Sequence, residues 1–212
     1  MDFKQIPGEC STLSSKNTRG ELGQAITAIV LTYSPRDLQQ MRGNFSDKIQ
    51  DINQEYREKL EETITGYLHG TYQTLRQMHE LKNFNHMRMS LSTDASDYWN
   101  MVAAQCSSAG DEQTVQLRFL KFLLAGFCMF VQGFPGHPVG MPFPGGDKVE
   151  IIDGVYYCPV REKANDVDAA LCPFCPALQT PEIGYLKPPL NASQHRKQEF
   201  IQNCYDYHNF NG

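Results

Sequence analysis

The chain has 212 residues, of which 41% are hydrophobic and 20% charged, the composition of a globular protein that can bury a core. Its net charge of −5, with no cluster of Lys and Arg, argues against a nucleic-acid-binding protein. The start of the chain shows no basic region followed by an apolar run, so we expect no signal peptide. Seven cysteines, an odd number, favour free thiols and a metal site in a reducing cytoplasm over a disulfide framework.

Residues 1–132 predict a mainly α-helical core of about four or five helices. An apolar stripe at helical spacing marks residues 20–33 as the first of them. The segment 34–37 (SPRD) then has the residues of a helix start, with Ser at the N-cap, Pro at the first position and an acid at the third. We expect Gly43-Asn44 to break the helix that begins there.

The longest periodic segment, residues 47–81, predicts a helix with acid–base pairs such as Glu55–Lys59 on its outer face. Two further helices are predicted over residues 93–106 and 111–132. The second half of the latter is apolar on all sides but is shorter than the roughly 20 residues that span a bilayer. It is therefore predicted to be a buried helix, and we expect no direct membrane insertion.

The composition changes at residue 133, beyond which lie ten of the twelve prolines. There, residues 148–160 (KVEIIDGVYYCPV) predict two short strands joined in a hairpin at Asp153-Gly154. The predicted organisation is a helical core (1–132), a module rich in Cys, Pro and Gly (133–177) and a tail (178–212). We expect a helical turn at 165–171, coil at 178–193 and a terminal helix at 194–206. The module has too little apolar content to hold itself together, which is one reason to place a metal there.

Three of the seven cysteines, Cys158, Cys172 and Cys175, are each followed directly by proline. Proline makes up about 5% of average sequences, so three such steps are not expected by chance. A Cys-Pro step fixes the backbone beside the sulfur, and the same step ends the ferredoxin-type iron–sulfur sequence. The two residues between Cys172 and Cys175 allow both sulfurs to reach one ion or cluster, and Cys158 adds a third thiolate. The pattern predicts a metal or cluster site.

An iron–sulfur cluster, of the four-iron type, fits this pattern best, because the proline rings would shield the sulfurs from water. Zinc is the alternative. In zinc-ribbon knuckles, amides just after the second cysteine point back at its sulfur, whereas here the next residue is Pro176, which has no amide. A thioredoxin-type redox pair is disfavoured because no strand–helix–strand context surrounds the cysteines.

The fourth ligand is open at this stage. His137 lies in a rigid loop (GHPVG) and is either a ligand, a donor to a sulfur or a loop histidine bonded to the backbone. Cys204 is the other candidate, or a tail thiol. A position taken by water, substrate or a partner's side chain is a third possibility. Cys106 and Cys128 lie on predicted helices and are expected to be core thiols.

Residues 137–175 contain the motifs HPVG-x-x-FPGG, GVYYCPV and ALCPFC. These motifs resemble the signature of an uncharacterised protein family found chiefly in methanogenic archaea. The resemblance implies a strictly anaerobic cytoplasm, in which an oxygen-labile iron–sulfur cluster survives. It singles out His137, Cys158, Cys172 and Cys175, and it supplies no activity.

The favoured hypothesis is a non-catalytic accessory protein whose iron–sulfur cluster responds to redox state or oxygen. Loss of the cluster would reorder residues 133–177 and create or remove a surface for a partner enzyme. The methanogen context suggests an oxygen-sensitive complex, such as a corrinoid methyltransferase. The alternatives are an enzyme that uses an open coordination position on the three thiolates and a zinc-stabilised scaffold. No catalytic residue is assigned, because no acid, base or nucleophile arrangement is evident in the sequence.

Overall fold

The computed structural model describes residues 5–107, 111–143, 146–162 and 171–181. This part of the chain contains six α-helices and one three-stranded sheet, so the predicted mainly α class is confirmed. The helices are α1 (Ile6–Ser14), α2 (Arg19–Val30), α3 (Pro35–Lys48), α4 (Gln54–Glu80), α5 (Asp94–Ser107) and α6 (Glu112–Gly126). The strands are β1 (Glu150–Ile152), β2 (Val155–Cys158) and β3 (Leu178–Gln179). Short turns of other helix types are η2 (Asn83–His86), η3 (Phe127–Gln132) and η4 (Cys172–Phe174).

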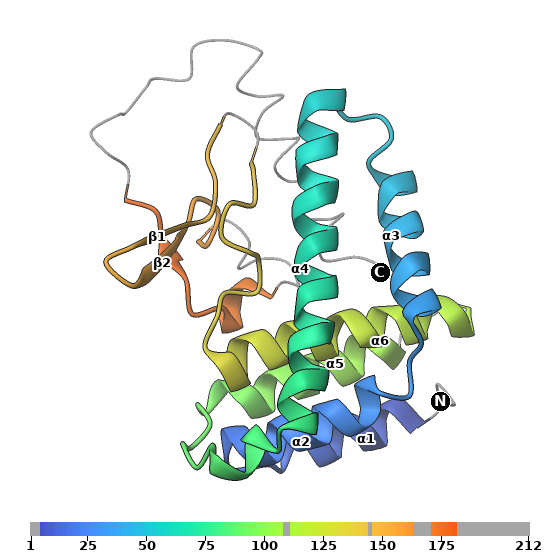
Figure 1. Cartoon of the computed structure of the whole chain (residues 1–212), viewed down its shortest axis with the longest axis vertical. Coiled ribbons are helices and arrows are strands. Elements are labelled where there is room, and N and C mark those ends of the chain that lie inside the picture. The colour runs from blue at the N-terminus through green and yellow to red at the C-terminus, as the bar shows by residue number, and fades with distance from the viewer. Residues whose placement is uncertain (1–4, 108–110, 144–145, 163–170, 182–212) are drawn as a thin grey trace.

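The helices form two layers (Figure 1). α1, α2, α5 and α6 make a lower layer, and the long helix α4 stands upright across it with α3 at its side. The small sheet lies beside α4, on the side away from α3. The N-terminal half of α4 therefore separates α3 from the sheet.

Local capping chemistry fixes the start of several helices. In α2, the Thr18 hydroxyl accepts the N–H of Glu21 at 3.2 Å, and the Glu21 carboxylate accepts the N–H of Thr18 at 3.1 Å, a capping box. The predicted start of α3 is confirmed, since the backbone N–H and the hydroxyl of Ser34 both donate to Asp37 Oδ2 at 2.7 Å. These caps satisfy donors that a helix leaves unbonded in its first turn.

Three local predictions were wrong. Gly43-Asn44 does not break a helix, because α3 continues through it to Lys48. A single interior Gly costs only about 1 kcal/mol, which the packing of Met41 on the same helix can outweigh. The longest helix begins at Gln54 rather than 47, where the Asn53 side chain accepts the N–H of Tyr56. Residues 178–179 were expected to be coil and instead form β3.

The main core is an apolar cluster formed mainly by α1, α2, α5, α6 and η3, with the C-terminal part of α4 packed against it. Helix α1, which had not been predicted, contributes Ile6, Cys10 and Leu13 and packs against α5. From α5, the fully buried Tyr98 and Trp99 meet edge to face at 4.9 Å between ring centroids. The predicted core thiols Cys106 and Cys128 are both buried here. Edge-to-face aromatic pairs of this kind favour one fixed arrangement of the core.

The continuous helical run Glu112–Gln132 joins α6 to η3, a π-helical segment. It is long and apolar enough to cross a membrane, yet 83% of its apolar window is buried inside the protein. The predicted burial of this helix is confirmed, and its bounds agree with the predicted range 111–132 to within one residue. π-Helical segments occur disproportionately at functional sites, and this one runs directly into the loop that precedes the cysteines.

The predicted hairpin at Asp153-Gly154 is confirmed. β1 and β2 pair antiparallel, with Ile152 opposite Val155, and both turn residues have positive φ angles of 50° and 80°. Asp and Gly tolerate this conformation better than other residues, as a two-residue hairpin turn requires. β3 adds to β2 in parallel, with Tyr157 opposite Leu178 and Cys158 opposite Gln179. The remaining predicted segments, 165–170 and 194–206, lie outside the described residues.

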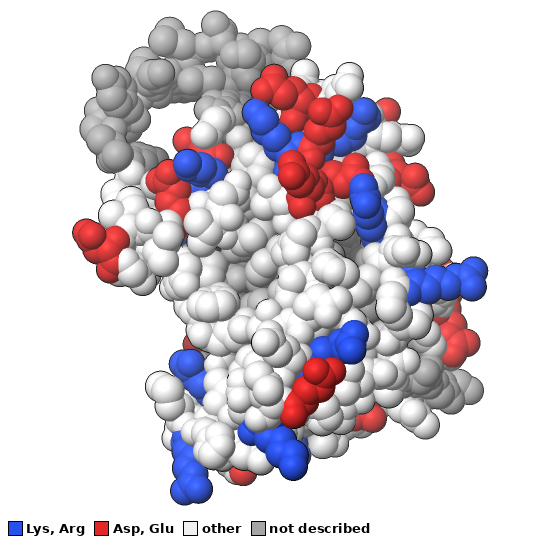
Figure 2. All heavy atoms as spheres, viewed as in Figure 1, with Lys and Arg blue, Asp and Glu red and all other residues white. Residues whose placement is uncertain are grey.

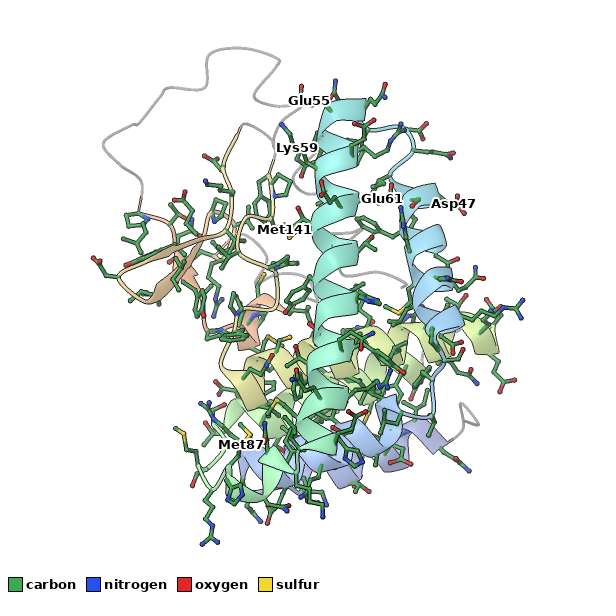
Figure 3. All side chains as sticks on the ribbon, viewed as in Figure 1. Asp47, Glu55, Lys59, Glu61, Met87 and Met141 are labelled. Atoms are coloured by element: carbon green, nitrogen blue, oxygen red, sulfur yellow. The ribbon has the colours of Figure 1, made fainter. Side chains whose placement is uncertain are left out.

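The module contributes to a second apolar cluster, which residues from the helices complete, so it does not depend on its own apolar content alone. Its buried members are Met141, Phe143, Val149, Cys158, Val160, Cys172 and Ala177. Two residues from the helices complete this cluster: Ile49, just after α3, and Leu60 of α4. Met141, which is fully buried, lies between the module and α4 (Figure 3). The apolar surface that the module lacks is thus supplied by residues far earlier in the chain.

Charged side chains gather over the end of the molecule where α3 meets the start of α4 (Figure 2). The predicted pair Glu55–Lys59 is present there at 2.8 Å, and Arg42 of α3 pairs with Glu61 of α4 at 3.1 Å. The side chains of Glu55, Lys59 and Glu61 are labelled in Figure 3. Exposed pairs of this kind contribute little to stability, so apolar packing holds α4 in place.

Replacing Gly20 by alanine should lower the free energy of unfolding by about 2–3 kcal/mol. A Cβ atom there would overlap the carbonyl oxygen of Phe84 and lie 2.9 Å from that of Met87, and backbone atoms cannot rotate away. Urea unfolding followed by circular dichroism measures the change. Gly66→Ala in α4 is the matched control, since nothing lies within 4 Å of its Cβ position, and should stabilise by up to about 1 kcal/mol. Equal effects of the two changes would contradict the close approach of α2 to the Phe84 turn.

Candidate metal centre

The three Cys-Pro cysteines lie on two short segments that the sheet brings together. Cys158 is the last residue of β2, and Cys172 and Cys175 lie in and directly after η4. After Cys175 the chain returns as β3 and pairs with β2, where the N–H of Thr180 donates to the Cys158 carbonyl at 3.1 Å. We call residues 158–161 the first hook and residues 172–177 the second hook.

All three thiols belong to the apolar cluster of the module. Cys158 and Cys172 are almost fully buried, at 4% and 3% exposure, whereas Cys175 is partly exposed. Burial raises the pKa of Cys158 to about 11 and the pKa of Cys172 to about 12, because a thiolate loses its hydration there. The charge of each neighbouring thiolate adds to the rise in the pKa of Cys172, so the three sulfurs lie within electrostatic reach of one another.

Backbone amides counteract this rise. The N–H of Gly136 donates to Cys175 Sγ at 3.4 Å, and the N–H of Ala177 lowers the pKa of the same thiol. The N–H groups of Val160 and Arg161 act in the same direction on the pKa of Cys158. The sequence-based objection to zinc, that Pro176 removes the amide after the second cysteine, is therefore weakened, because the amide of the next residue, Ala177, takes that role. Such N–H donors stabilise a thiolate and a metal-bound sulfur alike.

Arg161 connects the two hooks, and Gln179 of β3 contacts the first hook and the residue after it. Arg161 Nε donates to the carbonyl oxygen of Ala177 at 3.1 Å, and one terminal nitrogen lies 3.5 Å from the carbonyl oxygen of Pro173. Gln179 donates to the carbonyl of Pro159 and accepts the N–H of Glu162, both at 2.9 Å. Neither residue was identified from the sequence, since only the β2–β3 pairing brings them to the cysteines.

His137 lies next to Gly136, whose amide reaches Cys175. Its ring meets Phe143 of the module cluster edge to face, with centroids 6.5 Å apart. Burial, with the positive charge of Lys121 as a smaller cause, lowers the pKa of His137 to about 4. The imidazole is therefore neutral at neutral pH, which is the form that binds metals.

The described residues do not form a set of ligands to one metal ion. Within this part of the chain, no group of three or more His, Cys, Asp or Glu side chains lies at the spacing of ligands to one metal ion. The structure brings the three thiols into one cluster and places His137 at its edge, and the ligand roles stay predictions. Cys204, the other candidate for the fourth ligand, lies outside the described residues.

Tyr67 links a thiol of the helical core, Cys128, to the module. Cys128 of η3 lies 3.4 Å from the Thr71 hydroxyl, and the hydroxyl of Tyr67 donates to the carbonyl of Pro135 at 2.9 Å. Burial raises the pKa of Tyr67 well above its usual value, with Cys128 and Cys175 as smaller causes. Tyr67 thus lies between the core thiol and the module thiol. No pattern in the sequence indicates this contact, because Tyr67 occupies an ordinary core-facing helix position.

The fold and the thiols together define a helical protein with an appended cysteine- and proline-rich module. The chain belongs to a family described as an uncharacterised protein conserved in archaea (DUF2115), whose model matches residues 18–180. The predicted membership in an uncharacterised archaeal family with relatives in methanogens is confirmed.

Curated relatives come from two methanogens. The chain is 40% identical over 73 residues to a UPF0305 protein of Methanopyrus kandleri, covering 34% of this chain and 51% of that protein. It is 56% identical over 52 residues to a UPF0305 protein of Methanothermobacter thermautotrophicus, covering 24% and 34%. A further UPF0305 match in the same organism is 32% identical over 87 residues, covering 41% and 53%. The chain thus spans about half, or less, of the length of these relatives. No solved structure matches it significantly.

In metal-free protein at about pH 8, iodoacetamide should modify Cys175 before Cys158 and Cys172. With the pKa of Cys158 raised from 9.0 to about 11, its thiolate fraction is roughly a hundredfold below that of an ordinary cysteine. Burial raises the pKa of Cys175 as well, but this thiol is partly exposed, and the two amides that it accepts favour its thiolate. Peptide mass spectrometry at timed intervals measures the order. Equal rates at the three thiols, in protein with native circular dichroism, would contradict the burial of the first two.

Proposed function

We propose that the module binds an iron–sulfur cluster through Cys158, Cys172 and Cys175, and that the protein is a non-catalytic accessory protein. One observation supports the proposal above all. Thiols from two separate hooks lie in or against one apolar cluster, within electrostatic reach of one another, and backbone amides act on two of the sulfurs. A protonated thiol is only a weak acceptor and gains little from amide donors, whereas a thiolate or metal-bound sulfur gains more.

The raised pKa values of the thiols set the energetics of binding. A metal or cluster binds thiolates, so it must displace protons that burial holds in place, at about pKa 11 for Cys158. The amides and Arg161 reduce this cost. Binding is therefore expected to strengthen as pH rises and to stabilise the module, since each released proton is replaced by a bond to the metal.

Zinc is the second candidate, and a specific contact favours it. The amides of Val160 and Ala177, each two residues after a cysteine, act on that cysteine's sulfur. This is the arrangement expected of a zinc knuckle, and it weakens the main sequence argument against zinc. The prolines after all three cysteines favour the iron–sulfur cluster, since they limit water at the sulfurs. His137 suits either centre as a neutral fourth ligand.

An accessory role fits the groups beside the thiols better than an enzymatic one. Among the described residues, Arg161 acts on all three thiols, and its guanidinium stays protonated and cannot serve as a general base, while neutral His137 is proposed as a ligand. In this proposal the cluster, on oxidation, changes the shape of the module and so the surface offered to a protein partner. The partner, an oxygen-sensitive enzyme complex such as a corrinoid methyltransferase, stays a prediction.

The test is the metal content of the full chain purified without oxygen. We expect a brown protein with about four irons and matching sulfide, whose visible spectrum bleaches or shifts in air. Changing Cys158, Cys172 or Cys175 to Ser should each remove most of the metal while the helical circular dichroism persists. Cys106→Ser, which alters a buried core thiol of α5, is the matched control and should keep the wild-type metal content.

Each alternative outcome has a distinct meaning. A colourless protein holding one zinc would replace the iron–sulfur reading by the zinc scaffold. Wild-type metal content in any of the three hook variants would contradict the site. Loss of metal in the Cys106 control to the same extent would show that the hook variants act through general unfolding.

A further inference from the structure

We infer that Arg161 is the positioning residue of this thiolate site, holding the two hooks together and supplying the positive charge that three thiolates on one metal centre require. The inference rests on the proposed metal site and deepens it. It concerns a residue three positions after Cys158, whose side chain crosses to the opposite hook.

The contacts of Arg161 are directed at the backbone of the second hook. Its Nε donates to the carbonyl of Ala177, two residues after Cys175, at 3.1 Å. The more distant contact, 3.5 Å to the carbonyl of Pro173, reaches the residue directly after Cys172. A planar guanidinium can address two acceptors in fixed directions, which a lysine ammonium cannot. Arg161 therefore sets the position of the second hook relative to Cys158.

The same side chain places a permanent positive charge beside the sulfurs. It lowers the pKa of Cys158, Cys172 and Cys175 alike, so it lies within electrostatic reach of each. Three thiolates on a divalent ion, or on a cluster core of the same charge, leave one negative charge in excess, and neutral His137 adds none. Because a buried net charge is unfavourable, one cation beside the centre should strengthen binding.

Gln179 offers a comparison that separates geometry from charge. It also braces the first hook, through the carbonyl of Pro159 and the N–H of Glu162, but it is neutral. Removing Gln179 weakens the bracing alone. Arg161→Lys keeps the charge and loses the two-carbonyl contact, and Arg161→Gln loses the charge and keeps a short donor. The three variants therefore distinguish a charge effect from a structural one.

The experiment uses the full chain and its Arg161→Gln, Arg161→Lys and Gln179→Ala variants. Each is prepared without oxygen, loaded with ferrous iron and sulfide or, separately, with zinc, and titrated with a chelator. We expect Arg161→Gln to weaken metal retention by about ten- to hundredfold, as changes to groups that hold the metal ligands in place do. Arg161→Lys and Gln179→Ala should each lose less. With the iron–sulfur cluster, Arg161→Gln should also lower the reduction potential, because removing a cation favours the more oxidised centre, while Gln179→Ala should not.

Helical circular dichroism confirms that each variant is folded before loading. If Arg161→Gln retains metal as tightly as the wild type, with the same potential, the inference fails while the proposed function stands. If Arg161→Gln and Gln179→Ala lose metal equally and leave the potential unchanged, Arg161 has only a bracing role and the charge assignment is wrong. If the wild type binds neither iron nor zinc, the proposed function itself fails and the inference falls with it.

Discussion

The packing of helix α4 against two apolar clusters is the constraint on which the rest of the structure depends. Near its C-terminal end, Tyr72 and Leu75 lie in the main helical core, and near its N-terminal end Leu60 lies in the module cluster. At 1.5 Å per residue, Leu60 and Leu75 are roughly 22 Å apart along the helix. Hydrogen bonds from Tyr56 to the Pro142 carbonyl, at 3.0 Å, and from Tyr67 to the Pro135 carbonyl, at 2.9 Å, hold the irregular chain between them. The module therefore folds on a helix that the core has already fixed.

This arrangement explains how two thiols are buried and a third partly buried in one cluster. Apolar neighbours such as Met141 and Val149 exclude water from the thiols, which keeps the sulfurs protonated. Backbone amides and Arg161 act in the opposite direction and favour the thiolates. The three cysteines can thus be either neutral thiols in an apolar cluster or thiolates that act as ligands. A metal would shift that balance by replacing the protons, so metal binding and the order of the module are coupled.

The sequence was sufficient wherever the structure depends on neighbours in the chain. The start of α3 follows from Ser34 and Asp37, and the hairpin follows from Asp153-Gly154, because each depends on contacts within a few residues. Helix α1 was missed because it has only nine residues, and its buried face becomes evident only once α5 is there to cover it. Strand β3 has two residues, too few for any periodic pattern, and exists through its pairing with β2.

In the candidate site, too, some groups are evident from the sequence and others only from the structure. The Cys-Pro steps indicate the thiols directly, and the structure brings those thiols together. The groups around them come from tertiary contacts that no spacing rule reveals: the Gly136 amide from the loop after η3, and Gln179 from β3. Ile49 and Leu60, which complete the apolar cluster, lie far before the module's cysteines in the sequence. The module's own residues, considered alone, therefore offered too little apolar surface.

The extent of the family match bears on the fourth ligand. The matched range, residues 18–180, contains every residue that builds the thiol cluster, from Ile49 to Ala177, together with Arg161 and Gln179. It begins after α1 and ends before Cys204. A metal centre common to the family must take its ligands from inside this range, which includes His137 and excludes Cys204. His137 is therefore the stronger candidate, being neutral at neutral pH and next to the amide that contacts Cys175.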